Sequence, residues 1–261
     1  MRKLGFAVAV GLSAIGSAQA ADLPARTYTK APVAMMDPAT NWSGFYIGAH
    51  IGGAWSETTG TLVDATPPIA SPLGTSASAS GSGVIGGGQV GYNWQMAQWV
   101  FGIEGDISGA DVKNNNRVFA VLPPYPPGSF TDQNLRVNFL ATATGRIGYA
   151  WGQSLVYAKG GAAFMNGDYT GGQTVLGVGV FPVNSLSTTR TGWTLGAGFE
   201  QAFMGNWSWK IEYDFMHFGT DRDSFFAPTA NGTTTLDLST DVHVVKVGLN
   251  YRFNGPLVAK Y

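Results

Sequence analysis

The sequence predicts an all-β fold, an eight-stranded antiparallel up-and-down β-barrel that crosses a membrane. Three observations predict it. Eight segments alternate apolar and polar residues with period two, the connections between them are alternately long and short, and aromatic residues gather beside the short connections. Alternation places successive side chains on opposite faces of a strand. Long outer loops and short periplasmic turns are the arrangement of outer-membrane barrels.

The composition agrees with a folded chain whose exterior is not heavily charged. Of the 261 residues, 37 are Gly, none is Cys and 12% are charged, whereas a soluble domain carries about 25% charged residues. The 44% hydrophobic and 13% aromatic content excludes a disordered chain, because disorder requires low hydrophobicity. The lack of Cys excludes disulfides and thiolate metal sites. A net charge of −1 offers no electrostatic surface for nucleic acid.

The first residues predict export. Residues 1–20 combine a positive start at Arg2 and Lys3, a short apolar run, and small residues before a cleavage point after Ala20. This pattern is typical of a secretory signal peptide, and the run is shorter than the roughly 20 residues of a membrane-spanning helix. Residues 21–40 are rich in Pro and Ala without a period, which predicts an extended periplasmic tether.

The barrel itself is expected over residues 41–253, followed by a short tail at 254–261. The clearest strand is 207–215, in which Trp and other apolar residues at odd positions alternate with Ser, Lys, Glu and Asp at even ones. The expected strands are 42–56, 82–94, 99–112, 134–150, 154–168, 190–203, 207–218 and 241–253. The expected long loops are 57–81, 113–133, 169–189 and 219–240.

A soluble barrel with an apolar lumen would also alternate, so the faces need an argument. The polar face is mostly Gly, Thr, Ser and Asn, which suits a narrow lumen, and the strands are long enough to span a membrane at the roughly 9 to 11 residues required. Aromatic residues near the short turns predict an interfacial girdle. Its expected members are Trp42, Phe45, Tyr92, Trp94, Trp99, Phe101, Tyr149, Trp151, Tyr157, Phe199, Phe203, Trp207, Trp209, Tyr251 and Phe253.

Charged residues on the polar face predict a network inside the lumen. Unpaired charges there would be costly, so acids and bases should pair. Two interpretations stay open, a plug that braces the barrel and a narrow polar path; the small diameter of eight strands favours the plug. The predicted members are five acids and six bases: Glu104, Asp106, Arg136, Arg146, Lys159, Glu200, Lys210, Glu212, Asp214, Lys246 and Arg252.

Three histidines deserve a separate hypothesis. His50 should face the lumen, while His217 and His243 lie near the outer ends of the last two strands. Some barrel enzymes act on lipids with a His at the outer rim, but isolated His residues more often serve packing. No third ligand stands at a spacing typical of a metal site. We therefore expect no catalytic residue, no metal and no cofactor.

Two stretches carry a family resemblance. Lys246 to Phe253, KVGLNYRF, is similar to the assembly signal that closes outer-membrane barrels, with Lys246, Gly248, Tyr251 and Phe253 in its polar, Gly and aromatic positions. Residues DLPARTYTKAP and NWSGFYIGAHIGGAW resemble the outer-membrane immunogenic protein family, within the OmpA-like and opacity-like, porin-family barrels. The departure from that pattern is that residues 254–261 follow the signal.

The resemblance implies a surface-exposed protein of the cell outer membrane. The expected function is non-enzymatic: the barrel supports the envelope, and the loops serve adhesion or contact with a host or the environment, as loops on rigid scaffolds commonly do. A small-solute pore is the first alternative and a lipid-modifying enzyme the second. The expected partners are outer-membrane lipids and lipopolysaccharide, the assembly machinery, and an extracellular ligand or receptor, but no nucleic acid.

Overall fold

A computed structural model describes residues 40–66, 73–119, 130–175, 177, 179–227 and 232–253. The expected signal peptide at 1–20, nearly all of the tether at 21–40 and the tail at 254–261 lie outside the described residues. Within the described ranges, no helix has the length and hydrophobicity needed to cross a membrane.

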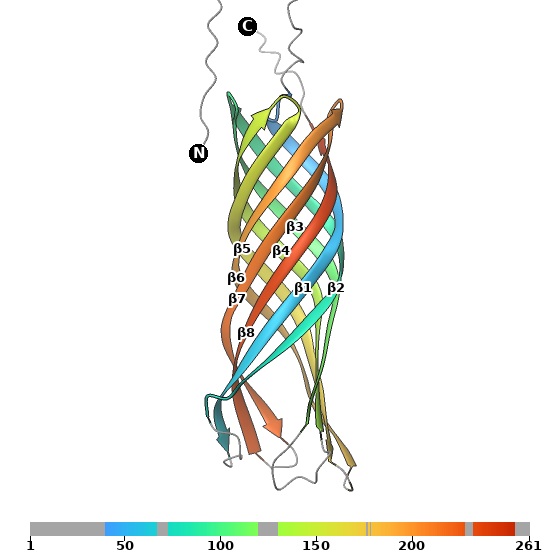
Figure 1. Ribbon diagram of the computed structural model, residues 1–261, viewed down its shortest axis with the longest axis vertical. Coiled ribbons are helices and arrows are strands. Elements are labelled where there is room, and N and C mark those ends of the chain that lie inside the picture. The colour runs from blue at the N-terminus through green and yellow to red at the C-terminus, as the bar shows by residue number, and fades with distance from the viewer. Residues whose placement is uncertain are drawn as a thin grey trace, which may run out of the picture. The chain divides into compact units, whose positions relative to one another are not determined.

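Eight antiparallel strands form a closed barrel in chain order, and the last strand pairs with the first (Figure 1). The predicted fold class is confirmed, because each predicted strand corresponds to one observed strand. The strands are β1 (Gly44–Thr66), β2 (Ser76–Met96), β3 (Trp99–Phe119), β4 (Phe130–Trp151), β5 (Ser154–Val175), β6 (Gly179–Met204), β7 (Trp207–Ala227) and β8 (Gly232–Arg252).

Three turns at one end are as short as a hairpin allows. Two residues separate β2 from β3, β4 from β5, and β6 from β7. The first residue of each turn has a positive φ: 54° at Ala97, 59° at Gly152 and 51° at Gly205. Positive φ belongs to the primed turns that match strand twist in two-residue hairpins, and it favours Gly, which two of the three turns contain. We call this end of the barrel the short-turn end.

At the opposite end, the loop end, the strands run further than predicted. They contain 21 to 26 residues, whereas the expected spans contain 12 to 17, so much of each predicted loop is strand. The Ser, Thr, Asn and Gly residues of these extensions show no alternation of apolar and polar positions. A hairpin with water on its outer side does not need that alternation, so the pattern ended before the strands did.

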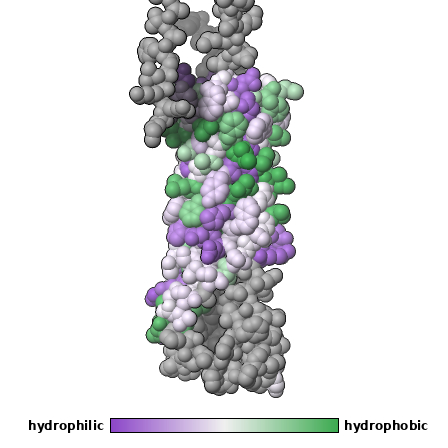
Figure 2. Space-filling view, in the orientation of Figure 1, coloured by the Kyte–Doolittle hydropathy of each residue, from purple (hydrophilic) through white to green (hydrophobic). Residues whose placement is uncertain are grey.

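Large apolar side chains cover the outer surface in a belt at the short-turn half of the barrel. Each strand contributes to this belt, for example Ile51 on β1, 69% exposed, and Ile107 on β3, 61% exposed. On the face shown in Figure 2, hydrophobic residues gather toward the short-turn end and hydrophilic residues follow toward the loop end. The belt is bounded at the short-turn end by exposed aromatic residues such as Trp94, Trp99 and Trp207.

Beyond the belt the barrel wall divides into two four-stranded arms. Pairing of β2 with β3 ends at Ser82 and Lys113, and pairing of β6 with β7 ends at Gly192 and Phe218, although all four strands continue. The continuations pair only on their other side, β2 with β1 and β7 with β8 in one arm, and β3 with β4 and β6 with β5 in the other. Figure 1 shows the strand ends spreading apart there.

Candidate functional site: the filled lumen

The inward row of β7 supplies the centre of the site. Ser208, Lys210, Glu212 and Asp214 occupy every second position of this strand, and each is at most 1% exposed. Strand geometry explains the placement, since alternate side chains must point to the same face. The outward positions between them, such as Ile211 and Tyr213, belong to the belt. The alternating residues of this strand therefore place a charged row inside the barrel and an apolar row outside it.

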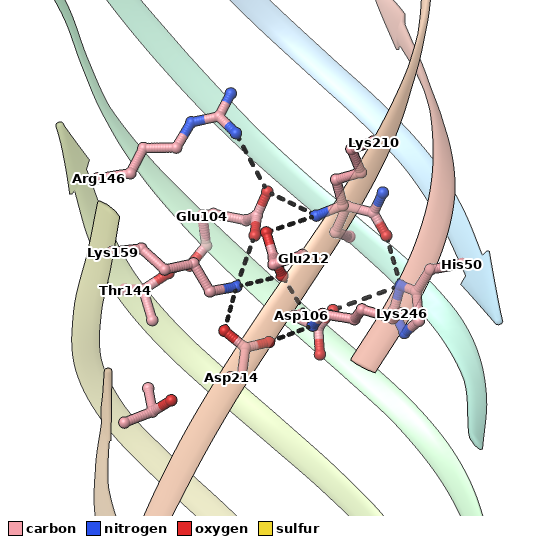
Figure 3. Close-up of polar contacts among 12 residues, drawn as sticks. His50, Glu104, Asp106, Thr144, Arg146, Lys159, Lys210, Glu212, Asp214 and Lys246 are labelled. Atoms are coloured by element: carbon pink, nitrogen blue, oxygen red, sulfur yellow. Dashed lines mark hydrogen bonds and ion pairs between the residues drawn. The ribbon is translucent and has the colours of Figure 1, made fainter. Parts of the chain in front are cut away.

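Two carboxylates share the cations at the centre of this lumen network (Figure 3). Lys159 Nζ lies 2.8 Å from Glu212 Oε1 and 3.1 Å from Glu104 Oε1. Lys210 Nζ lies 3.2 Å from Glu212 Oε2 and 3.4 Å from Glu104 Oε2. Lys246 Nζ completes the surroundings of Glu212 at 3.1 Å from Oε1 and also contacts Asp214 Oδ2 at 3.0 Å. Each central carboxylate therefore faces at least two ammonium groups from different strands.

His50 extends the network toward β1 and β2. Its Nδ1 lies 2.6 Å from Gln89 Oε1, and its Nε2 lies 2.7 Å from Ser108 Oγ. Nδ1 is also 3.4 Å from Asp106 Oδ2, and Asp106 in turn contacts Lys246 Nζ at 3.1 Å. Both ring nitrogens are thus occupied within the lumen, so this histidine is a member of the buried network.

Two buried tyrosines anchor the central carboxylates. Tyr46 Oη donates to Glu104 Oε2 at 2.7 Å, and Tyr157 Oη donates to Glu212 Oε2 at 2.5 Å. A Cβ added at Gly91 would lie 2.3 Å from Tyr46 Oη, and one added at Gly198 would lie 2.5 Å from Tyr157 Cζ. The tyrosine rings therefore lie directly over these two glycines, where any larger residue would displace them.

A smaller polar and apolar layer closes the short-turn end. Arg146 Nη1 lies 3.6 Å from Glu200 Oε2, and Ser208 Oγ donates to Glu200 Oε1. The Arg252 guanidinium lies 4.2 Å from the ring centroid of the fully buried Trp42, a cation–π contact. Trp42 belongs to a cluster of buried residues at this level. The cluster comprises Trp42, Val100, Ala150, Leu155, Tyr157 and Ala202.

A second apolar layer fills the lumen on the loop side of the charges. On β7 the inward row changes from Asp214 to Met216 and Phe218, and on β8 it changes from Lys246 to Val244 and Val242, all at most 2% exposed. These side chains pack as one buried cluster. Its members are Ala54, Ile85, Val112, Val137, Leu140, Ala163, Met165, Met216, Phe218, Val242 and Val244.

Ten of the eleven residues predicted for the lumen lie inside and are at most 6% exposed, and the exception is Arg136. Arg136 is exposed and pairs with Asp111 at 3.2 Å on the outer surface. The prediction for Arg136 was wrong because β4 has an irregular register against β5 between Val137 and Phe139. A bulge reverses the parity between the residues on its two sides, and Arg136 lies on the other side of this bulge from the strand segment that faces the charged layer. Without Arg136 the predicted set contains five acids and five bases.

Two residues predicted for the aromatic girdle lie inside the barrel instead. Trp42 is 0% exposed and Tyr157 is 2% exposed. The sequence could have placed Tyr157 inside, because it lies two residues from Lys159 on the same strand and therefore points to the same face. Parity also locates Arg190, which the prediction missed: it is buried on β6, at an even position like Glu200, and its Nε lies 3.4 Å from Asp221 Oδ2.

The other two histidines lie on the outer surface. His217 Nδ1 is 2.6 Å from Asp241 Oδ1, and His243 Nδ1 is 2.8 Å from Tyr213 Oη. In the part of the chain that the structure describes, neither ring has a Ser or Thr hydroxyl as a hydrogen-bond partner. The same residues include no group of three or more His, Asp or Glu arranged to hold a metal ion.

The residues of the expected assembly signature divide between the two faces. Lys246 lies in the charged layer, and a Cβ at Gly248 would come within 3.1 Å of His50 Cβ. Tyr251 and Phe253 point outward with ring centroids 5.1 Å apart, and Phe253 N donates to the Phe45 carbonyl at 2.8 Å. The signature thus joins the closing strand to β1, while its role in assembly stays a prediction.

The chain is similar to known outer-membrane proteins over most of its length. A family model described as outer membrane protein beta-barrel domain matches residues 6–253. The 31 kDa outer-membrane immunogenic protein of Brucella melitensis is 31% identical over 91% of this chain and 94% of its own length. The 22 kDa outer membrane protein of Rhizobium leguminosarum bv. viciae is 28% identical over 84% and 82%, respectively.

Solved barrels show a more distant likeness. The outer membrane protein OprG from Pseudomonas aeruginosa has a TM-score of 0.47 at 14% identity, covering 80% of this chain and 97% of its own. Neisserial surface protein A has a TM-score of 0.37 at 15% identity, covering 81% and 98%.

Proposed function

The chain belongs to the outer membrane protein β-barrel family, and from this premise we propose that it is a non-enzymatic, non-conducting surface protein. In this proposal the filled barrel braces and anchors the protein in the outer membrane, and the two arms and their loops contact the outside. Relatives named immunogenic proteins support a surface exposed to a host, because antibodies reach only accessible segments.

One observation carries the non-conducting part: the lumen is filled on three successive levels. The charged layer lies between the apolar cluster around Met216 and Phe218 and the one around Trp42. An ion crossing the described lumen would have to leave water at the apolar layer around Met216 and Phe218, which costs several kcal/mol per charge. A conducting barrel instead needs polar inward residues along its whole length.

The bracing part rests on the number of strands that the network joins. Glu104 on β3 contacts Lys159 on β5 and Lys210 on β7, while Glu212 on β7 contacts Lys246 on β8. The two pairs of Glu104 cross the lumen between strands that are not neighbours in the wall, whereas Glu212 and Lys246 are register partners on the neighbouring strands β7 and β8. Because a buried charge without its partner is costly, any deformation that separates the strands loses several contacts together.

The contact part rests on the arms. Their exposed outer side chains include polar ones, as at Thr59 and Arg222, and the arms continue past the end of the apolar belt. Polar, exposed strand extensions and loops on a rigid barrel are common positions for binding. The loop residues proposed for contact, such as Phe225 and Phe226, have side chains outside the described part of the chain.

Conductance in a planar bilayer tests the non-conducting part. Purified protein should give no stepwise currents under conditions in which a general porin, added to the same membrane as the positive control, conducts. Reproducible stepwise currents from the folded monomer would favour the pore alternative. A matched variant, Met216→Ala with Phe218→Ala, thins the outer apolar layer; any current that appears only in this variant would confirm that the layer blocks the lumen.

Lipid analysis and protease accessibility test the remaining parts. A deletion strain should retain an unchanged lipid A acyl profile in mass spectra, and an altered profile restored by the wild-type gene would contradict the non-enzymatic proposal. On intact cells, an external protease should cut within the arms and leave residues 207–215 protected.

Protection of the whole chain from the protease would contradict surface exposure of the arms.

A further inference from the structure

A compact polar and aromatic patch lies on the outer surface of β6, β7 and β8, outside the lumen network. We call it the outer-rim patch and define it as Trp193, Tyr213, Phe215, His217, Asp241 and His243. All six residues are on outward positions and are partly or fully exposed. The patch depends on the outer-membrane location of the chain and is independent of whether the lumen conducts.

The patch is held together by direct contacts between neighbouring strands. Trp193, His217 and Asp241 are register partners across β6, β7 and β8. The Trp193 ring centroid lies 5.6 Å from that of His217, and His217 Nδ1 lies 2.6 Å from Asp241 Oδ1. One row of the patch is therefore an aromatic ring, an imidazole and a carboxylate side by side.

A second row follows two residues closer to the short turns. Phe215 and His243 are register partners with ring centroids 5.2 Å apart, and His243 Nδ1 lies 2.8 Å from Tyr213 Oη. His243 also pairs in register with Trp55 of β1, which is 50% exposed. The two rows together present two imidazoles, each beside at least one aromatic ring.

The patch marks the loop-side limit of the apolar belt. Toward the short turns the same strands expose Leu195, Ile211 and Val247, whereas toward the loops they carry the exposed Arg222 with its partner Asp237. In an outer-membrane barrel the long loops face outward. The patch is therefore at the depth where hydrocarbon gives way to the headgroups of the outer leaflet, which in Gram-negative bacteria is built of glycolipid.

The opposite side of the barrel has a different surface at this depth. Among its described outward residues at the belt limit none is an imidazole, and the exposed carboxylate of Asp111 on β3 is already paired with Lys113 and Arg136. The apolar residues at this limit include Val84 on β2, Ile107 on β3, Phe139 on β4 and Phe164 on β5. A general interfacial girdle would distribute its polar aromatic residues around the barrel, so the one-sided patch requires a more specific explanation.

We propose that the outer-rim patch binds the sugar headgroup of an outer-leaflet glycolipid. The exposed rings of Trp193 and Phe215 offer apolar faces to the C–H face of a pyranose. In each histidine Nδ1 is engaged by a protein group, while among the described residues no partner meets Nε2. With Nδ1–H donated to Asp241, Nε2 of a neutral His217 accepts a hydrogen bond, as a sugar hydroxyl would supply.

Charge distinguishes a sugar from a phosphate as the bound group. Asp241 brings a carboxylate into the patch, and its register partner on β1 is Glu57. Two carboxylates repel a bare phosphate at this position, whereas hydroxyl groups donate to carboxylates readily. Phospholipid headgroups, which carry a phosphate at the same depth, therefore fit the patch less well than a sugar does.

Native mass spectrometry of the intact folded protein in detergent tests the proposal, with lipid A freed of its phosphate groups and phosphatidylglycerol as the two probes. The wild type should retain lipid A in preference to phosphatidylglycerol. Trp193→Ala combined with His217→Ala should weaken lipid A binding about tenfold, which corresponds to one or two lost contacts. Phe139→Ala combined with Phe164→Ala, at the same depth on the opposite side, should change it less than about twofold.

Two results would overturn the proposal. Equal retention of both lipids by the wild type would mean that the patch does not recognise sugar, and equal losses in the two double variants would reduce it to a general girdle. The heat-dependent shift in gel migration verifies that each variant is folded. If the alanine pair does not fold, Trp193→Leu keeps apolar bulk without the ring face and should still lose the preference for lipid A.

Discussion

Replacing Glu212 by Gln should destabilise the barrel more than any substitution of a surface charge. The substitution preserves the size of the side chain but removes its negative charge. Glu212 lies within 3.2 Å of the ammonium groups of Lys159, Lys210 and Lys246. In the variant these three buried cations share one carboxylate fewer, and the balanced set of five acids and five bases acquires a net charge of +1.

The expected cost follows from the burial of both partners. The side chains of Glu212 and Lys210 are 0% exposed, so the pair is not weakened by solvent. Removing one member of a buried pair costs about 3–5 kcal/mol. A second substitution, Lys210→Met, removes a cation whose acidic partners, among the described residues, are Glu104 and Glu212. The double variant should therefore recover a coupling energy of about 1–3 kcal/mol relative to the sum of the single changes.

Urea unfolding in detergent, followed by the gel-migration shift and by tryptophan fluorescence, measures these differences. The matched control is Asp111→Asn, which breaks exposed ion pairs with Lys113 and Arg136 and should leave the unfolding midpoint unchanged. If Glu212→Gln unfolds at the same urea concentration as this control, the lumen network does not brace the barrel. Strict additivity in the double variant would refute the pairing of Glu212 with Lys210.

Three further outcomes test other parts of the structure. Gly198→Val should cost about 1–3 kcal/mol by displacing the buried tyrosine ring above it, whereas Gly105→Val, where an added Cβ meets nothing within 4 Å, should unfold like the wild type. Hydrogen bonds from Arg222 hold the pKa of Asp237 below its ordinary value. This pair should therefore stabilise the outer part of the β7–β8 hairpin above about pH 3.9, and the stabilisation should be lost as the pH falls through the lowered pKa. In Arg222→Gln, a pH titration of the Asp237 carboxyl resonance by NMR should show a higher pKa. Phe253→Ala should lower the amount of heat-modifiable barrel in cells if the closing signature directs assembly, and an unchanged amount would contradict that role.

The part of the fold within the apolar belt was predictable because each residue there faces one of two very different surroundings. On β7 the outward Trp207, Trp209 and Ile211 alternate with the inward Lys210 and Glu212, so one strand defines both faces. The same parity, carried to the other strands, located ten of the lumen charges. Parity counts residues only, so it failed at Arg136, beyond the irregular register of β4.

The strand extensions and the apolar layers were not predictable by the same reasoning. Beyond the belt the outer face meets water, so polar residues occupy both kinds of position and no period remains. At the apolar cluster around Met216, both faces of β7 are apolar instead. Met216 and Phe218 point inward and Phe215 points outward, yet all three are apolar or aromatic. Alternation requires a contrast between faces, and neither segment has one.

The position at which alternation disappears is itself informative about the lumen. On β7 the inward row becomes apolar after Asp214, on β8 it becomes apolar before Lys246, and on β1 the inward Ala54 lies in the same buried cluster. A water-filled barrel would keep polar inward residues, and therefore a visible period, up to the loops. Here apolar inward residues interrupt the period at one level on these strands while pairing continues, and buried polar residues follow at Ser56, Thr58 and Thr240. This interruption at one level supports the proposal of a plugged barrel, which the conductance measurement tests.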